Sequence, residues 1–356
     1  MTPPLQIRDR SDAGKLAVAG PDAAPFLQAL LTADLAGLAP GSGAPTALLT
    51  PKGQVRALGR VLAIERGYLL HCERPALEGL FRGLWSGRVG WRIALHKLTL
   101  QQGLVTVVGD DAAARLGLPL PADAAEHAHV ATDLDGIPAR AVRSWAGVDL
   151  VVRADRVAPL LRAIAARRQP PSPGSRCAPW SLSDQNAHLL GGEGAVGGEG
   201  AVGGEGADWS ALRIAAGRLL YGTDASDGML PAELALGEAT VATGKGLYPG
   251  LQTVLRQQRS GTVHRRLCRV HAPRALLAPG DGLIAAPPPA DRPPAADLPV
   301  AAPPAAEPRP VGTVTSASAF DGLALVRAAA LDGPLLHRET GTPVTATPLE
   351  EARPSL

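Results

Sequence analysis

The chemistry-bearing residues of this sequence concentrate in residues 242–267, ATGKGLYPGLQTVLRQQRSGTVHRRL. Glycines, among them Gly246 and Gly250, surround Lys245 and Tyr248, so the backbone must turn tightly beside a cation and a phenol. We expect a loop that holds a ligand, with Lys245 as an anion contact and Tyr248 as a ring contact. The alternative is an exposed lysine beside a packed aromatic residue.

The second half of this stretch is rich in arginine. Residues 256–266 alternate apolar and basic residues, which is typical of a strand with one solvent-facing side. Such a run could approach RNA or a polyglutamate tail, but it lacks the interleaved aromatic residues on which bases stack. We interpret it as a solvated face and predict no direct nucleic-acid partner.

The sequence lacks the usual motifs of metal and nucleotide sites. The eight histidines form no HExxH and no zinc spacing with cysteine, and His127 and His129 stand in an acidic, alanine-rich stretch that we expect to be a loop. The GGEGAV repeat of residues 191–206 contains GxGxxG only because it repeats, and no strand precedes it. We therefore predict no metal site and no dinucleotide site.

The three cysteines, Cys72, Cys177 and Cys268, are few, odd in number and widely spaced, which fits a reducing cytoplasm. None has a neighbouring base, and no GxSxG is present, so we expect buried, inert thiols and no catalytic residue.

Composition sets the remaining limits. A chain of 356 residues with 46% hydrophobic residues can bury a sizeable core and predicts two or three domains. Because only 3% of the residues are aromatic, the core must consist mainly of alanine, leucine and valine. The amino terminus lacks a signal-peptide pattern and no apolar run has the length of a membrane span, so we expect a soluble cytoplasmic protein without a membrane partner.

The loop must be positioned by elements that alternate between strand and helix patterns. In the first half, strands are expected at residues 15–20, 47–50, 55–64, 68–71, 91–100 and 104–109, with helices from residue 21 and over 75–85. The second half repeats this order less clearly, with helices at 110–116 and 155–167 and strands at 138–143 and 148–152. Short turns between the strands favour antiparallel sheets.

The rest of the chain reads as a flexible insertion and a small barrel. We expect a flexible, glycine-rich loop at 191–206, because it cannot bury enough apolar surface to offset its ordering entropy. Barrel strands are expected at 267–271, 282–285, 312–316, 323–327 and 343–346, with an extended Pro/Ala-rich insertion at 286–310. The expected fold is α+β, with a module over residues 1–262 in two similar halves (about 5–110 and 111–262) and a barrel over 263–356.

Several stretches resemble the YgfZ-type folate-binding proteins, relatives of the glycine-cleavage aminomethyltransferases. KGLYPGLQ resembles their KGCYxGQE signature, the segment from Trp209 to Glu233 resembles W-x-x-L-x-I-E-A-G...P-x-E, and weaker likeness covers residues 16–34 and 312–316. The resemblance implies a folate-binding module of two pseudo-symmetric halves. It also implies that tetrahydrofolate or another folate contacts Trp209, Glu233, Lys245, Gly246, Tyr248 and Gly250.

The departures from the family pattern are informative. The signature cysteine is Leu247 here, which we expect to pack as an apolar plug, and Cys268 lies in a predicted strand with nothing to return it to the loop. The family's pocket glutamate is Ala215, which leaves the donor-rich edge of a pterin short of an acceptor. Ala57 and Leu58 occupy the positions where the transferases carry a catalytic aspartate.

Three functions follow from this pattern. The first is a non-enzymatic, YgfZ-like folate-binding factor that supports assembly or repair of iron-sulfur clusters and, indirectly, tRNA modification, with cluster assembly proteins or client enzymes as partners. The second is a tetrahydrofolate-dependent aminomethyltransferase. The third is a degenerate scaffold that acts as a binding module. The missing carboxylate at positions 57 and 58 argues against the second.

Overall fold

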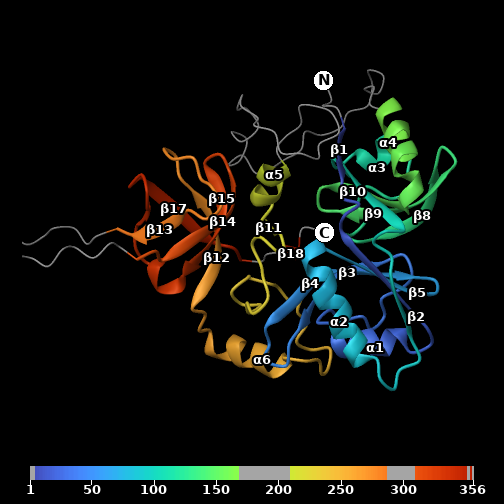
Figure 1. Cartoon of the computed structure of the whole chain (residues 1–356), viewed down its shortest axis with the longest axis horizontal. Coiled ribbons are helices and arrows are strands. Elements are labelled where there is room, and N and C mark those ends of the chain that lie inside the picture. Colours follow the sequence, from blue (N-terminus) through green and yellow to red (C-terminus); the bar gives the residue numbers. More distant parts are fainter. Residues whose placement is uncertain (1–4, 168–208, 287–308, 351–352, 355–356) are drawn as a thin grey trace, which may run out of the picture.

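The computed structural model describes residues 5–167, 209–286 and 309–350, together with the backbone of 353–354. Two expected features, the glycine-rich loop at 191–206 and all but the ends of the Pro/Ala-rich insertion at 286–310, lie outside these residues. Within them, two sheets with their helices form one end of the molecule and a barrel forms the other, with α5 and α6 between them (Figure 1).

The first sheet has five antiparallel strands in the order β3-β4-β5-β2-β6. Its elements are β2 (Gly14–Ala19), α1 (Ala23–Leu30), β3 (Gly43–Leu49), β4 (Val55–Ile64), β5 (Gly67–Cys72), α2 (Leu77–Gly87) and β6 (Ala94–Lys97), with a 3₁₀ turn at Arg74–Ala76 before α2. Leu77, Leu80 and Leu84 lie about one helical turn apart on α2 and are buried. Their spacing gives the helix one apolar face, which packs against the sheet.

The second sheet has the order β1-β7-β10-β9-β8 and is also antiparallel. Its elements are β1 (Gln6–Asp9), β7 (Gln102–Val108), α3 (Ala112–Arg115), β8 (His129–Leu134), β9 (Ile137–Ser144), β10 (Gly147–Arg153), a 3₁₀ turn at Ala154–Arg156 and α4 (Val157–Ala166). This order repeats the first sheet. In the first sheet β6 is the edge strand that pairs with β2. In the second sheet β1 is the corresponding edge strand and pairs with β7, so the amino-terminal strand completes the second sheet.

A buried polar layer joins the two sheets. Arg60 of β4 forms an ion pair of 2.7 Å with Asp149 of β10, and both side chains are fully buried. His71 of β5 faces the Arg60 guanidinium, and Thr106 of β7 donates to Asp149 at 2.7 Å. Because removal of either partner would leave a buried charge unpaired, this ion pair is a polar link between the two sheets.

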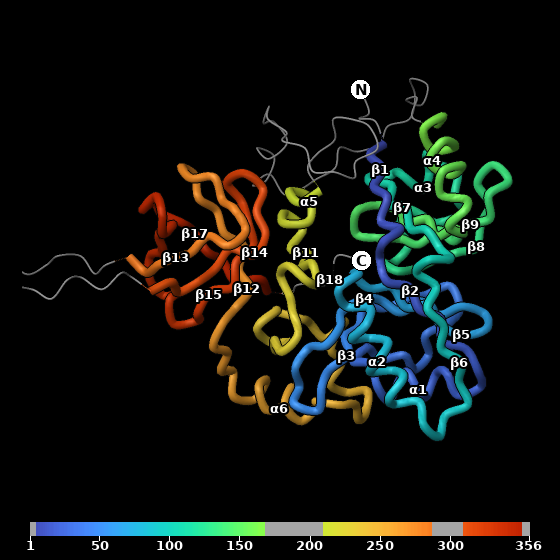
Figure 2. Tube along the Cα trace, in the orientation of Figure 1, coloured from blue at the N-terminus to red at the C-terminus, as the bar shows by residue number. Residues whose placement is uncertain are grey.

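The remaining chain connects the sheets to the barrel. It comprises α5 (Trp209–Ala215), β11 (Arg218–Leu219) and α6 (Leu251–Ser260), followed by the barrel strands β12 (Arg265–His271), β13 (Gly282–Ala285), β14 (Gly312–Ser318), β15 (Asp321–Arg327), β16 (Leu335–His337) and β17 (Pro343–Pro348). A 3₁₀ turn at Ala328–Ala330 follows β15, and β18 (Arg353–Pro354) returns to pair with β11. Figure 2 shows the turn between β3 and β4 beside α6.

The barrel is closed, in the order β12-β15-β14-β13-β16-β17, which confirms the expected α+β fold with a carboxy-terminal barrel. Two local predictions are wrong. Residues 256–260 are not strand but the end of α6, which begins after Gly250 and ends at Gly261, both in the left-handed conformation. His129 does not lie in a loop but is the first residue of β8, a strand whose four central residues alternate between half-buried and exposed.

No helix in the described part of the chain combines the length and the apolar character that a membrane crossing requires.

Candidate functional site

Gly250, at the end of the 242–250 loop, packs against the turn after β3. Its φ is +86°, and a Cβ built there would meet the Cα of Gly53 and the carbonyl oxygen of Thr50 at 2.6 Å. A side chain is therefore excluded by the neighbouring backbone as well as by its own conformation. The turn at residues 50–53 and the KGLYPG segment therefore pack directly on each other.

Lys245 is held against α1. Its Nζ donates to the carbonyl oxygen of Gln28, whose side-chain amide donates back to the Lys245 carbonyl at 3.3 Å. The Nζ lies 5.3 Å from the centre of the Tyr248 ring, within cation-π range. Burial lowers the pKa of Lys245 to about 8. The observed partners of the Lys245 side chain belong to α1 and to the loop itself, so Lys245 holds the loop against α1.

The neighbours of Lys245 divide into one buried and two exposed residues. Tyr248 is buried, burial raises its pKa to about 12, and its hydroxyl has no hydrogen-bond partner among the described residues. Gly246 is exposed, and a Cβ there would meet nothing within 4 Å. Leu247 is 82% exposed, so the expectation that it packs as an apolar plug is wrong. Because Gly246 and Gly250 turn the chain around Tyr248, the tyrosine fills the interior and Leu247 points outward.

Glu233 lies at the joint between the connecting segment and the barrel. One carboxylate oxygen accepts the backbone N–H of Leu230 at 2.9 Å and the other pairs with Arg265 of β12 at 2.9 Å. The Glu233 carbonyl also accepts the backbone N–H of Leu267 at 2.8 Å. Its observed contacts therefore tie a turn to the first barrel strand.

Trp209, the first residue of α5, lies in a different cluster. Its ring packs on Trp145, from the turn between β9 and β10, with ring centres 5.0 Å apart at an angle of 48°. The guanidinium groups of Arg8 and Arg10 lie over the Trp209 ring at 4.9 and 5.5 Å, and that of Arg218 lies over Trp145 at 5.6 Å. We call these five residues the tryptophan cluster. Its members come from the amino terminus, a hairpin turn, α5 and β11.

Two carboxylates flank the tryptophan cluster. Arg10 pairs with Glu73 at 2.8 Å, and Arg218 forms a fork with both oxygens of Glu126 at 2.8 and 2.9 Å. Burial lowers the pKa of Arg8, the Arg10 charge lowers it further, and the Glu73 charge acts in the opposite direction. The cluster is thus an aromatic surface under three cations, a composition suited to a flat anionic ligand.

The residues proposed from the sequence therefore separate into three places. Lys245, Gly246, Tyr248 and Gly250 share one loop, Glu233 lies at the barrel joint, and Trp209 alone lies in the tryptophan cluster. Sequence reasoning missed Arg8, Arg10, Trp145 and Arg218. A signal existed for Trp145, which interrupts two strand patterns at a short turn, and for the arginines of the Arg-Asp-Arg run near the amino terminus.

The residues that the sequence analysis considered for catalysis and that the structure describes are buried. Ala57 and Leu58 are buried in β4, so no carboxylate stands at the transferase position. Cys72 and Cys268 are free and buried, and burial raises the pKa of each thiol to about 12. Cys177 lies outside the described residues. Within the described ranges, no group of three or more His, Cys, Asp or Glu side chains is arranged to hold a metal ion.

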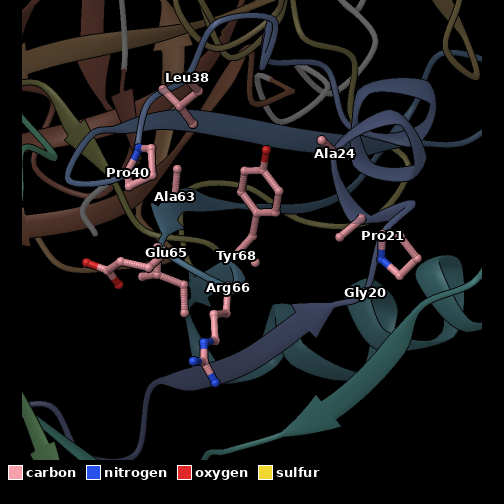
Figure 3. A pocket seen from close by; sticks show the side chains of 12 residues that line it. Gly20, Pro21, Ala24, Leu38, Pro40, Ala63, Glu65, Arg66 and Tyr68 are labelled. Carbon is pink, nitrogen blue, oxygen red and sulfur yellow. The ribbon is translucent and has the colours of Figure 1, made fainter.

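A separate pocket of about 350 Å³ opens beside α1 and the turn between β4 and β5. The Tyr68 ring stands between Leu38 and Pro40 on one side and Pro21 and Ala24 on the other (Figure 3). Its volume is in the range of small-ligand sites, which begins at about 300 Å³. No residue of the tryptophan cluster or of the 242–250 loop lines it.

The first comparison with known proteins concerns the barrel. Residues 265–354 match the family described as CAF17, C-terminal beta-barrel domain. Compared by sequence with curated proteins, the chain has no significant match.

Among solved structures, the chain is similar to the glycine cleavage system aminomethyltransferase T from Bartonella henselae. The two share 17% identity with a TM-score of 0.69, over 98% of this chain and 88% of that one. It also matches the heterotetrameric sarcosine oxidase from Corynebacterium sp. U-96 at 19% identity over 47% of this chain and 87% of that one, with a TM-score of 0.34, too low to bear on the fold. The chain therefore has the fold of an aminomethyltransferase, α+β with antiparallel sheets, and ends in a closed barrel that matches the CAF17 type.

Proposed function

We propose that this protein binds tetrahydrofolate or another folate at the tryptophan cluster and acts without catalysis of its own. The observation that carries the proposal is the pair Trp145 and Trp209 lying beneath the guanidinium groups of Arg8, Arg10 and Arg218. The aminomethyltransferase fold, which covers 98% of this chain, supports the proposal, as do the stretches that resemble folate-binding proteins.

The residues present fit the parts of a folate. A pterin and an aminobenzoyl ring are flat and stack on indole rings, and the glutamate carboxylates pair with guanidinium groups. Arg8 is exposed on β1, where it can meet the acidic tail, while Arg10 is buried and fixed by Glu73. Of the six residues expected from the sequence, the proposal keeps Trp209 as a contact. The other five stabilise the scaffold, namely Glu233, Lys245, Gly246, Tyr248 and Gly250.

The proposed role is that of a YgfZ-like accessory factor in the cytoplasm that supports iron-sulfur cluster assembly or repair and, through cluster enzymes, tRNA modification. Cluster assembly proteins or client enzymes are its proposed partners. Ala57 and Leu58 remove the acid-base group that the transferase alternative needs. Thiol chemistry at the signature position is excluded by Leu247, and the buried thiols of Cys72 and Cys268 cannot replace it.

Ligand binding is tested by titrating the wild-type protein with tetrahydrofolate and following tryptophan fluorescence, corrected for absorbance by the folate. Trp209→Leu should weaken binding at least tenfold, because it removes the stacking surface. Trp85→Leu is the matched control, since Trp85 lies on α2 and packs on Phe81 away from the cluster. Equal affinity of wild type and Trp209→Leu would contradict the proposed site.

The accessory role is tested by complementation of a strain that lacks its own YgfZ-type protein. The readout is the activity of a cluster-dependent tRNA-modifying enzyme. Wild type and Cys268→Ser should restore this activity equally, because no thiol is required. Rescue by Leu247→Cys but not by wild type would show that this chain does not perform the role.

A further inference from the structure

The first sheet ends in an edge strand whose outer side has no main-chain partner among the described residues. β6 pairs only with β2, and just beyond its end the backbone N–H of Leu98 donates to the Lys15 carbonyl at 2.8 Å. Because main-chain groups alternate in direction along an antiparallel strand, those of Leu95 and Lys97 point away from β2. Figure 2 shows β6 on the side of the molecule opposite the barrel. This edge therefore presents unpaired main-chain donors and acceptors to the outside.

α2 places an aromatic pair beside this edge. Phe81 and Trp85 lie about one helical turn apart, and their rings stack with centres 5.6 Å apart at an angle of 21°. The Lys97 ammonium lies 4.1 Å from the centre of the Phe81 ring, so the pair borders β6. Trp85 is 46% exposed, and an exposed tryptophan in a stacked pair beside an unpaired strand is typical of a contact with another molecule. We call six residues the α2–β6 surface, namely Phe81, Arg82, Trp85, Arg88, Leu95 and Lys97.

The α2–β6 surface is positively charged. Glu78 of α2 pairs with both Arg82 and Lys97, each at 2.8 Å, so a single carboxylate is shared by two cations. The Arg88 guanidinium lies 3.5 Å from the centre of the Trp85 ring, and its polar partner is the Trp85 carbonyl oxygen rather than a carboxylate. Three cations thus lie beside one carboxylate. The excess of positive charge favours an acidic partner.

We propose that the α2–β6 surface binds an extended, acidic segment of a partner protein, which adds a strand to the first sheet beside β6. The edge of a strand offers donors and acceptors in alternation, and another main chain complements both. The phosphates of a nucleic acid would offer acceptors only. A second copy of this chain would bring the same cations together, so charge favours a different protein. The inference concerns a protein partner and holds whether or not the chain binds a folate.

The position of the added strand predicts the side-chain pattern of the partner. Neighbouring strands lie about 4.8 Å apart, and their side chains alternate between the two faces of the sheet. Lys97 contacts Glu78 and Phe81 of α2, so every second residue of β6 faces α2. Every second residue of the added strand would therefore also lie on the side of α2. An acidic residue there would pair with Lys97, and an apolar residue two positions along would pack beside the aromatic pair.

The probe is a capped, fluorescently labelled peptide of two Glu-Thr-Val-Thr repeats, titrated with the full chain and followed by fluorescence anisotropy. We expect saturable binding with a dissociation constant below about 1 mM, and slower amide hydrogen exchange in β6. A peptide of the same sequence that is N-methylated at every residue keeps the charges but has no main-chain donor. It should bind at least fivefold more weakly.

Variants of the chain locate the binding surface. Lys97→Gln and Trp85→Ser should each weaken peptide binding at least fivefold. Arg259→Gln is the matched control and should change the affinity by less than about twofold, because Arg259 is exposed near the end of α6 and its loss removes the same charge elsewhere. Thermal unfolding without peptide shows which variants are folded. Lys97 is an exposed residue, so Lys97→Gln decides the test if Trp85→Ser loses its fold.

Several results would overturn the inference. Equal binding of the N-methylated peptide would mean attraction by charge without an added strand, and unchanged binding by folded Lys97→Gln would place the peptide elsewhere. Absence of saturation below about 1 mM would mean that Lys97 only guards the edge against pairing. Tighter binding of a thymidine octanucleotide, with the same dependence on Lys97, would assign the surface to nucleic acid. A dimer of the chain alone with slow exchange in β6 would make the surface a contact between copies.

Discussion

At the scale of single residues, Gly250 is where two turns far apart in the sequence meet. Both its conformation, with φ at +86°, and its contact with Gly53 require the absence of a side chain. Gly246 shares the left-handed conformation, with φ at +102°, but has open space around it. Alanine substitutions at the two glycines therefore separate the free-energy cost of the left-handed conformation from the cost of the steric clash.

Gly250→Ala should lower the free energy of unfolding by more than Gly246→Ala. The left-handed conformation costs an alanine about 1–2 kcal/mol at either position. At position 250 the Cβ also overlaps backbone atoms of Thr50 and Gly53, and such overpacking adds about 1–3 kcal/mol. Urea unfolding midpoints of the two variants measure the difference, and equal losses would show that the two turns do not pack as described.

The same loop shows which residue properties the sequence predicts. The glycines predict a tight turn, and the structure has one. This prediction succeeds because the conformational freedom of glycine is a local property. The direction of Leu247 was not predictable, since the choice between Leu247 and Tyr248 for the interior depends on α1 and the β3–β4 turn. Leu247 is exposed because Tyr248 fills that space instead.

At the scale of elements, the polar layer between the sheets makes a prediction about stability. Asp149→Asn should destabilise the protein by about 3–5 kcal/mol, because it leaves the Arg60 guanidinium buried without its counter-charge. The double variant Arg60→Met with Asp149→Asn should lose less than the sum of the single changes Arg60→Met and Asp149→Asn, since no charge then remains unpaired. Denaturant unfolding of the three variants gives the coupling energy, and strict additivity would contradict the ion pair.

Two histidines near this layer predict how stability depends on pH. Burial lowers the pKa of His127 to about 3 and that of His129 to about 4, below the ordinary value of 6.5. Between these values the unfolded chain binds more protons than the folded one, so stability falls as pH drops below 6.5. From pH 7 to pH 5 the loss from His127 alone is about 2 kcal/mol.

His127→Asn tests this pH dependence, because asparagine tolerates the left-handed conformation that His127 adopts, with φ at +72°. Unfolding of wild type and variant is compared at pH 7 and pH 5. The variant should lose less stability between the two pH values than wild type does. The same loss in both proteins would show that His127 titrates normally.

The types of several elements were predictable from the local sequence pattern. The strand over residues 55–64 and the barrel strand over 282–285 match β4 and β13 in both bounds. The end of α6 was misread as a strand, although Arg256 and Arg259 are three residues apart and the buried pair Leu251 and Val254 has the same helical spacing. β8, HVATDL, was missed because its polar residues do not alternate with apolar ones, so the strand pattern is absent.

At the scale of the whole molecule, the candidate site depends on one pairing that no local pattern reveals. β1 pairs with β7, and this brings Arg8 and Arg10 to the tryptophan that begins α5, about two hundred residues later in the sequence. α5 is joined in turn to the barrel, because Arg213 binds both Asp224 and Ser316 of β14. Composition and periodicity predict the sheets and the barrel, but only their assembly produces the cluster.

The most direct measurement of the central claim is isothermal titration of the full wild-type chain with tetrahydrofolate at low and at physiological salt. We expect one ligand per chain and an affinity that weakens as salt rises, because the exposed Arg8 guanidinium binds the carboxylate tail. Trp209→Leu should abolish most of the signal at either salt concentration. Absence of heat, together with an unchanged thermal unfolding midpoint at saturating folate, would contradict the claim that this protein binds a folate.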